Sequence, residues 1–245
     1  EIDATGAMIA SLDLDPAGDR AAGLGQDGWI SIVDVRRGVL TASSHLDVAG
    51  LGHVTFSRNG RWILVAGKRR PGPADVLADR AIVIDAADAG IVGELVDGAP
   101  ISSAEFSHDS TRALTASRAG SVRIWCIPSC DSDGEQLLHG APVTCARFTP
   151  DGLSVVSGTE AGPRSEVSLW ELSTGVRRVL AGRQRDRIES IDVTRDGQRI
   201  VADSRDLVIA TWSLDGRPLS SFSAWTLPIE TRWTPDGQRL VTLGR

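Results

Sequence analysis

A polar tight turn recurs six times along the chain, and its spacing limits the possible folds more than any other feature. The third residue of the turn falls at positions 18, 60, 110, 152, 197 and 237, so that successive turns are 40 to 50 residues apart. The turns are Pro16–Gly18, Arg58–Gly60, His108–Ser110, Pro150–Gly152, Arg195–Gly197 and Pro235–Gly237. This step matches a unit of four short strands and is too long for ankyrin or tetratricopeptide repeats.

Each of the first five turns follows three apolar residues with fixed offsets of three and then two positions. These triples are Ile9/Leu12/Leu14, Leu51/Val54/Phe56, Ile101/Ala104/Phe106, Val143/Ala146/Phe148 and Ile188/Ile191/Val193. The sixth unit offers only Ile229 and Trp233, with Pro228 and Thr231 at the other two places. The step of two predicts a strand with one face in the core, and the odd step predicts a bulge at the start of that strand.

Further β-rich runs follow each turn, and the third run of a unit is the clearest. These third runs are Trp29–Val33, Ala81–Ile84, Val122–Trp125, Val167–Trp170 and Leu207–Trp212. Proline and glycine punctuate the connections, and no segment keeps a helical apolar period. The chain 1–245 is therefore expected to be one all-β domain of five complete four-stranded units and half of a sixth. The expected bounds are 7–45, 49–97, 99–140, 141–182, 186–224 and 228–245.

Two stretches closely resemble a WD repeat: Val143–Gly152 followed by Ser165–Glu171, and Ile188–Gly197 followed by Asp206–Ser213. The resemblance extends over nearly the whole chain. It implies a β-propeller of antiparallel four-stranded blades arranged round a channel. In many blades of this family four side chains form a hydrogen-bonded tetrad. They are an Asp in the turn before the third strand, the Trp of that strand, a His before the first strand, and a Ser or Thr.

The tetrad residues carry over only in part. The turn Asp is matched by Asp27, Asp79 and Asp206, the Trp by Trp125, Trp170 and Trp212, and the His by His139 alone. No unit contains all three, and the fourth has Arg164 where the Asp would stand. The complete tetrad is therefore expected in no unit, and apolar packing has to supply more of the stability.

Composition narrows the function classes. A formal charge of −6 argues against a general nucleic-acid binder. The apolar stretches are too short to span a bilayer, which argues against a membrane partner. The cysteines Cys126, Cys130 and Cys145 lack C-x-x-C spacing, which favours reduced thiols and a cytoplasmic location.

The sequence also lacks the motifs that carry catalysis. The four histidines show no metal-ligand spacing, and neither a G-x-S-x-G elbow nor a phosphate-binding glycine loop is present. We expect no catalytic residue, no cofactor and no metal. The main alternative is a propeller enzyme of the lactonase or peptidase-associated type, whose channel metal would need convergent acidic ligands. The first strands offer only Glu105, Asp192 and Glu230 as isolated candidates.

Acidic and basic residues fall in different types of loop. The turns between first and second strands are acidic, with Asp15, Asp19, Asp109, Asp151, Asp196 and Asp236. The loops between second and third strands are expected to form a basic face that binds an acidic protein segment. One connection between a fourth strand and the next first strand is expected to open onto the same face. Its candidate residues are Lys68, Arg69, Arg70, Arg80, Arg118, Arg164, Arg183 and Arg205. The alternative is ordinary solvated loop charge, since surfaces usually mix both signs.

These observations favour a scaffold that binds other proteins, as the sensor or docking module of a larger multidomain protein. Half of a sixth unit leaves strand edges open, so the missing strands are expected from the rest of a parent chain, of which this sequence would be a fragment. Lys68 is the only lysine among 26 basic residues, which suggests a GC-rich bacterial genome.

Overall fold

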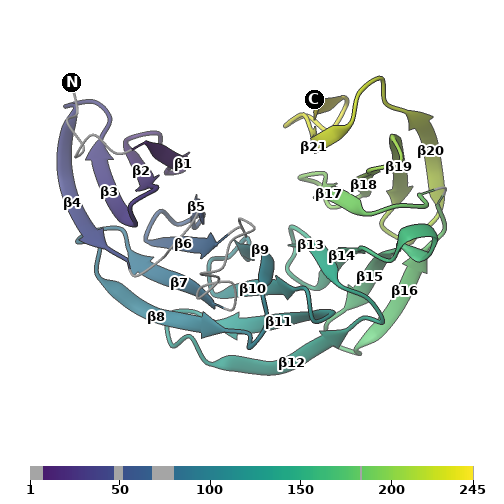
Figure 1. Ribbon diagram of the computed structural model, residues 1–245, viewed down its shortest axis with the longest axis horizontal. Coiled ribbons are helices and arrows are strands. Elements are labelled where there is room, and N and C mark those ends of the chain that lie inside the picture. Colours follow the sequence, from purple (N-terminus) through teal and green to yellow (C-terminus); the bar gives the residue numbers. More distant parts are fainter. Residues whose placement is uncertain (1–7, 47–51, 68–79, 183, 245) are drawn as a thin grey trace. The chain divides into compact units, whose positions relative to one another are not determined.

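The computed structural model describes residues 8–46, 52–67, 80–182 and 184–244. Over these residues the fold is all-β, with one short 3-10 helix, η1 (Gly162–Arg164). Five antiparallel sheets have four strands each, and a sixth has two (Figure 1). The expected fold class, five complete units and half of a sixth, is confirmed. Among the described residues, no helix has the length and apolar character needed to cross a membrane.

Within each sheet the strands lie side by side in chain order. The first sheet comprises β1 (Ile9–Leu14), β2 (Arg20–Gly25), β3 (Trp29–Asp34) and β4 (Val39–His45), and the second comprises β5 (Gly52–Phe56), β6 (Trp62–Gly67), β7 (Arg80–Asp85) and β8 (Ile91–Val96). The third comprises β9 (Ile101–Phe106), β10 (Arg112–Ser117), β11 (Ser121–Cys126) and β12 (Ser132–Leu138), and the fourth comprises β13 (Val143–Phe148), β14 (Ser154–Thr159), β15 (Val167–Glu171) and β16 (Val176–Leu180). The fifth comprises β17 (Ile188–Val193), β18 (Arg199–Ser204), β19 (Val208–Ser213) and β20 (Pro218–Ser223), and the sixth comprises β21 (Pro228–Trp233) and β22 (Leu240–Gly244).

The chain divides into two compact units. Unit 1 is residues 1–115 with 123–135, and unit 2 is residues 116–122 with 136–245. Unit 1 holds the first two sheets, unit 2 holds the last three, and the division passes through the third sheet.

The expected bulge at the start of the first strand is present in four sheets. The pairing of first and second strands shifts between Ile9 and Ser11, between Val143 and Cys145, between Ile188 and Ser190, and between Pro228 and Glu230. A bulge adds one residue to a strand, so apolar side chains on its two sides are separated by an odd step and still share a face.

The sixth sheet shows which residues of its first strand face the core. Pro228 and Thr231 are buried, whereas Ile229 is exposed and Trp233 is half-buried. The shift between Pro228 and Glu230 places residues 228, 231 and 233 where the other sheets have their triples. The spacing of the strand therefore determines which side chains face inward, even where a hydroxyl residue occupies the inward position.

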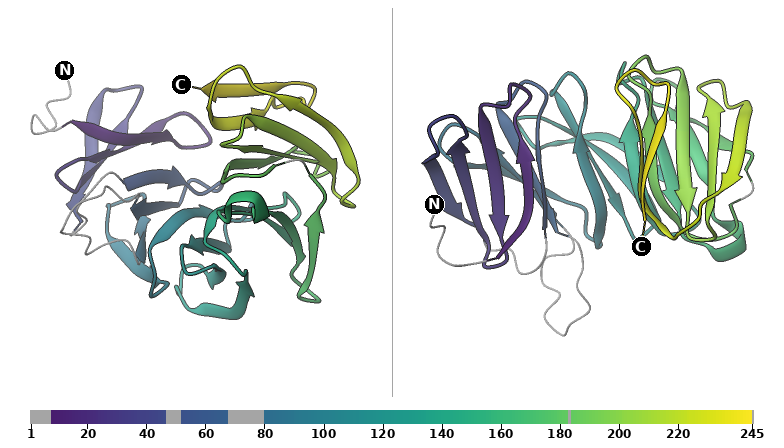
Figure 2. Two further views of the ribbon diagram at one scale, coloured as in Figure 1. Left: turned by 45° about the vertical axis from the view of Figure 1, so that its right-hand side comes forward. Right: turned by 90° about the horizontal axis from the view of Figure 1, so that it is seen from above.

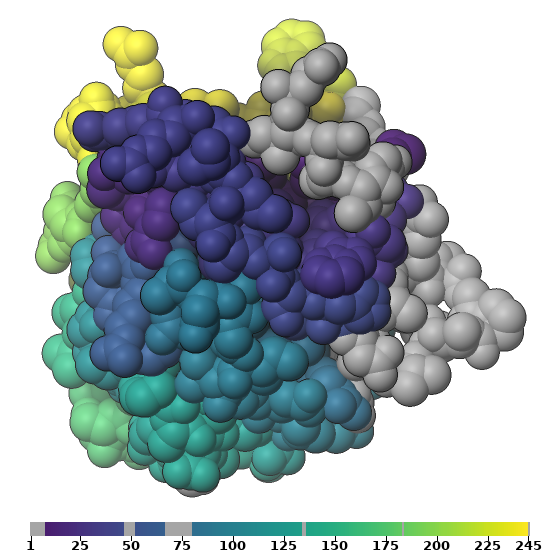
Figure 3. Space-filling model, turned by 90° about the vertical axis from the view of Figure 1, so that its left-hand side faces the viewer, coloured from purple at the N-terminus to yellow at the C-terminus, as the bar shows by residue number. Residues whose placement is uncertain are grey.

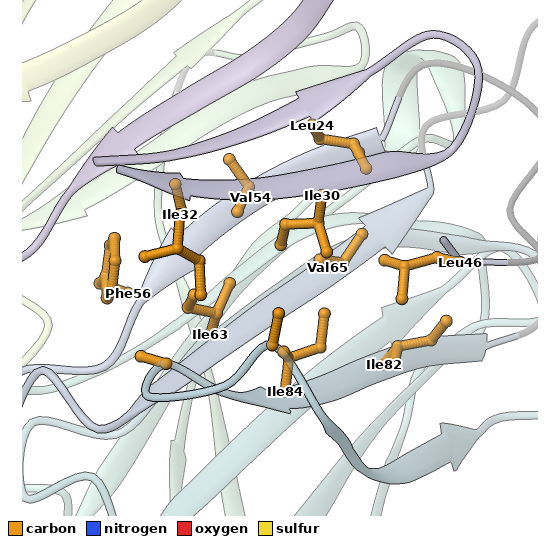
Figure 4. Close-up of a cluster of buried hydrophobic side chains, with 13 residues drawn as sticks. Leu24, Ile30, Ile32, Leu46, Val54, Phe56, Ile63, Val65, Ile82 and Ile84 are labelled. Carbon is orange, nitrogen blue, oxygen red and sulfur yellow. The ribbon is translucent and has the colours of Figure 1, made fainter. Parts of the chain in front are cut away.

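One core cluster of unit 1 lies between its first two sheets. Figure 4 shows Leu24, Ile30 and Ile32 of the first sheet packed against Val54 and Phe56 of β5 and against apolar residues of β6 and β7. All of these side chains are buried. Each large apolar side chain removed from water contributes on the order of 1.5–3 kcal/mol, so the sheet-to-sheet contact is a main source of stability.

An equivalent core in unit 2 joins the fourth and fifth sheets, which appear from two further directions in Figure 2. Trp212 of β19 is fully buried among Val156, Val167, Leu180 and Ile188. The fourth strand β16 and the first strand β17 thus both contribute to the same apolar cluster.

The apolar triple of the first sheet is not in the core, contrary to the expectation. Ile9, Leu12 and Leu14 are 58%, 57% and 50% exposed. The reason is the alternation of the strand: Ser11 and Asp13 face the second sheet, so Leu12 and Leu14 point the opposite way. The triples face the preceding sheet, and within the described residues no sheet precedes the first. Figure 3 shows the first sheet, in purple and dark blue, at the surface.

The phenylalanines of the triples differ in burial. Phe56 and Phe148 are buried, as expected, whereas Phe106 is only half-buried. The third unit's triple therefore enters the core less fully at Phe106 than the second and fourth units' triples do at Phe56 and Phe148.

Candidate protein-interaction surface

The fourth sheet assembles three members of the tetrad that the resemblance implies: Trp170, Ser157 and His139. Trp170 of β15 donates from Nε1 to Ser157 Oγ at 3.2 Å and to His139 Nε2 at 3.1 Å. The His139 Nε2 and Ser157 Oγ atoms are 2.7 Å apart, and His139 Nδ1 lies 3.2 Å from the Leu137 carbonyl oxygen. This pattern fits a neutral imidazole that donates from Nδ1 and accepts at Nε2.

The surroundings of His139 keep it uncharged. Burial and, to a smaller extent, the nearby Arg177 guanidinium lower its pKa from 6.5 to about 4. Arg164, which stands where the family has an acid, lies exposed on η1. The imidazole therefore holds a structural bond between strands rather than a proton available for catalysis.

The third sheet builds a related chain with a carboxylate in place of the imidazole. Trp125 Nε1 donates to Thr115 Oγ1 at 3.0 Å, and Thr115 Oγ1 donates to Asp97 Oδ2 at 2.7 Å. Asp97 precedes the first strand of its sheet by four residues, as His139 does in the next sheet. Sequence reasoning missed Asp97, although this shared spacing was a visible signal.

In the fifth sheet the tryptophan changes its partner. Trp212 Nε1 donates to the Ala181 carbonyl oxygen at 2.7 Å, because Ala202 stands at the place of the Ser157 hydroxyl. Asp206 accepts a hydrogen bond from the Arg185 backbone N–H at 2.7 Å and another from the Ser204 hydroxyl. Asp206 thus ties its loop to the connection before β17.

The remaining structural candidates lie in unit 1. Asp27 Oδ1 accepts a hydrogen bond of 3.3 Å from the Trp29 backbone N–H, and the Asp27 carbonyl oxygen lies 3.1 Å from His45 Nε2. Asp79 lies outside the described residues. The Asp27 side chain therefore contributes to its own turn.

Four of the eight basic candidates are described. Lys68, Arg69, Arg70 and Arg183 lie outside the described residues. Arg80, in unit 1, forms an ion pair of 2.8 Å with Glu94 of the neighbouring outer strand. The other three, Arg118, Arg164 and Arg205, lie in unit 2.

In unit 2 the arginines gather around acidic side chains. Glu160 Oε2 lies 3.0 Å from Arg118 Nη2 and 3.5 Å from Arg187 Nη1, and Arg187 Nε lies 3.3 Å from Glu189. Burial raises the pKa of Glu189, although Arg187 acts in the opposite direction. We call Arg118, Glu160, Arg164, Arg187 and Arg205 the loop surface.

Backbone hydrogen bonds hold the segments that carry the loop surface. Glu160 N–H donates to the Pro142 carbonyl oxygen at 2.9 Å, and Arg205 N–H donates to the Arg187 carbonyl oxygen at 2.9 Å. Arg164 N–H donates to the Ala161 carbonyl oxygen within the same loop as Glu160. Arg164, Arg187 and Arg205 thus stand on hydrogen-bonded backbone, which lowers the entropy lost when a partner orders these loops.

The acidic turns on the other loops have a structural role. In four of them a Ser or Thr hydroxyl donates to an aspartate two residues later, and that aspartate accepts a backbone N–H: Ser107/Asp109, Thr149/Asp151, Thr194/Asp196 and Thr234/Asp236. The hydroxyl bonds from Thr194 and Thr234 lower the pKa values of Asp196 and Asp236. These carboxylates close the turns, so the acidity of the loops does not by itself indicate a binding face.

Two of the acids considered as channel ligands are engaged by the protein itself. Asp192 Oδ2 accepts a 2.8 Å hydrogen bond from the Trp233 backbone N–H, and Asp192 Oδ1 lies 3.8 Å from both Arg147 and Arg232. Glu230 pairs with Arg232 at 2.5 Å. Over the described part of the chain, no three His, Cys, Asp or Glu side chains form a possible metal-binding group.

A family model for the WD domain, G-beta repeat, matches residues 92–126. This segment runs from β8 through β11 and contains Asp97, Thr115 and Trp125. A search of curated proteins finds no match to the chain.

Proposed function

We infer that this chain, whose repeated four-stranded sheets and matched repeat fit the WD-repeat β-propeller family, is a scaffold that docks other proteins. Repeats of this family generally mediate protein–protein interaction, and their domains are typically not enzymes. We further propose that the partner contributes an acidic segment to the loop surface of unit 2. In this proposal the chain is a docking module within a larger protein.

The convergence of Arg118 and Arg187 on one carboxylate supports this proposal most directly. Both guanidinium groups reach Glu160 Oε2 within 3.5 Å, and all three side chains are about one-third exposed. Exposed ion pairs contribute little to folding stability, roughly 0–1 kcal/mol. A contribution to folding stability therefore does not explain well why the two arginines lie around Glu160. An acidic side chain of a partner can compete with Glu160 for the same two arginines.

Arginine also suits a carboxylate or phosphate partner by geometry. Its planar guanidinium offers two parallel donors to two oxygens, which an apolar ligand cannot use. Arg164, in the loop of Glu160, and Arg205, whose backbone bonds that of Arg187, are exposed and add further guanidinium donors. Because Glu160 and Glu189 offset part of the positive charge, the surface favours a few well-placed acids over a uniformly charged polymer.

A charge-reversal pair tests the docking surface. Arg164→Glu with Arg205→Glu should slow the association of a purified partner about tenfold at low ionic strength and should weaken its salt dependence, because charges at the rim of an interface act mainly on the encounter rate. Biolayer interferometry at low and high salt measures both quantities. The matched control is Arg36→Glu with Arg37→Glu, two side chains of unit 1 that are each 80% exposed. Unchanged kinetics in the Arg164/Arg205 pair would contradict the proposal.

We also propose a cytoplasmic location for the protein. The cysteines Cys126, Cys130 and Cys145 are free, which suits a reducing compartment. Burial raises the pKa of the Cys145 thiol to about 12, so this thiol is not a reactive nucleophile.

A further inference from the structure

The outer strand of the fifth sheet, β20, lacks the usual protection of an edge strand. All six of its residues are exposed, none is charged, and within the described residues β20 pairs only with β19 (Figure 1). Three other outer strands carry charge: Glu94 in β8, Asp133 in β12, and Arg177 and Arg178 in β16. Charges on an edge oppose the pairing of a foreign strand, so β20 is open to it.

A groove with a cavity volume of about 400 Å³ lies beside β20. It is formed entirely within unit 2, by β19, β20 and the segment that follows β16. Its lining contains no charged residue and includes Ala181, Gly182, Trp212, Leu219, Ser220 and Ser221. The fourth and fifth sheets, which form it, both have four strands.

The residues of the groove wall are held in place. Trp212 Nε1 donates to the Ala181 carbonyl oxygen at 2.7 Å. A Cβ atom at Gly182 would lie 3.0 Å from Trp212 Cζ2, so glycine permits this close approach. The Thr211 and Ser220 hydroxyls lie 2.7 Å apart and bond each other. The groove is thus a preformed space with uncharged walls.

We propose that β20 binds an extended segment of a partner protein, which adds as a fifth strand and places an apolar side chain in the groove. An added strand satisfies the free N–H and C=O groups of the edge, and its alternate side chains face the groove. Pro218 has no N–H, so pairing extends over Leu219–Ser223. A charged side chain would lose hydration in the uncharged groove, which selects against it. This site shares no residue with the loop surface and goes beyond the proposed function.

A labelled heptapeptide, Thr-Val-Thr-Leu-Thr-Val-Thr, provides a defined probe. Fluorescence anisotropy should show saturable binding. Replacing the central Leu with Glu should weaken binding at least tenfold, and methylating alternate backbone nitrogens should abolish it. Hydrogen exchange should slow at those amides of Leu219–Ser223 that do not bond β19 when the peptide is bound.

Two lysine substitutions locate the site on the protein. Ser221→Lys places a charge on the exposed edge inside the groove and should weaken peptide binding at least tenfold. Ser43→Lys is the matched control on β4, an outer strand of unit 1 whose residues, apart from its terminal His45, are also uncharged, and it should leave binding unchanged. The Arg164→Glu, Arg205→Glu pair should retain peptide binding, which distinguishes this site from the loop surface.

Three results would overturn the proposal. The first is no binding of the heptapeptide up to its solubility limit, or equal binding of the Leu and Glu peptides. The second is unchanged exchange at the β20 amides under saturating peptide, a measurement that needs no variant. The third is a concentration-dependent dimer that Ser221→Lys abolishes, which would identify a second copy of this chain as the occupant.

Discussion

In the third sheet the Asp97 carboxylate accepts a 2.7 Å hydrogen bond from the Thr115 hydroxyl. In the fourth sheet the His139 imidazole nitrogen Nε2 lies at the same distance from the Ser157 hydroxyl. Both hydroxyls accept the indole N–H of the sheet's tryptophan. An anionic acceptor and a neutral one thus meet the same requirement, that a buried hydroxyl and a buried indole N–H both find partners.

Asp97→Ala should lower the free energy of unfolding by about 2 kcal/mol, because it leaves Thr115 without its acceptor and the bond it removes is to a charged group. Asp97→His should lose less, since an imidazole fills this role in the next sheet. Urea denaturation measures both changes. The exposed Asp131→Ala is the control and should fall within about 0.5 kcal/mol of the wild type. An equally small loss for Asp97→Ala would contradict the structural role.

His139 should make stability sensitive to mild acid. The pKa of its side chain is about 4 in the folded protein and 6.5 in the unfolded chain, so the unfolded chain binds the proton more readily between these values. Its contribution is complete above about pH 6.5 and is lost as the pH falls towards 4, with a loss of about 2 kcal/mol by pH 5. Urea denaturation at a series of pH values measures this slope. His139→Gln should flatten it, and a slope unchanged by that substitution would assign it to other groups.

Two aspartates should respond to pH with opposite sign. Burial raises the pKa of Asp203, so the folded state binds its proton more tightly, and stability from this group is lost as the pH rises through the folded pKa. Hydrogen bonds from Thr194 and from the Gln198 backbone lower the pKa of Asp196, whose contribution is lost as the pH falls.

Relative to the wild type, Asp203→Asn should therefore gain stability from about pH 3 to about pH 7, and Asp196→Asn should lose it. Thermal melts across this range give both differences. Parallel curves for the two variants would show that the titration of neither carboxyl is linked to folding.

The half-buried Phe106 should tolerate truncation better than the buried Phe148. Phe148→Ala is expected to cost roughly 3 to 5 kcal/mol, because it removes a buried ring and leaves a cavity. Phe106→Ala should cost clearly less, since part of its ring already contacts water. Equal losses in chemical denaturation would mean that the two positions are equally buried in solution.

The repeat of the sequence determined the strands, the turns and the bulges. Turn residues with φ near +70°, such as Gly152 and Gly197, are required by local backbone geometry, and their spacing sets the length of each unit. The alternation within a strand, together with the bulge between Val143 and Cys145, likewise places Val143 and Phe148 inside without reference to distant residues. These features depend on interactions over a few residues, which is why the pattern alone predicts them.

The tertiary structure decided which hydrogen-bond or ion-pair partner each side chain has within the chain. Trp212 has the same repeat position as Trp170, yet it bonds a backbone carbonyl because Ala202 brings no hydroxyl to it. Arg118 was expected to present its charge on a basic face, but the fold brings Glu160, 42 residues away, to within 3.0 Å of it. Hydrogen bonds and ion pairs act over a few ångströms and depend on direction, so they are settled only when the folded chain brings distant residues together.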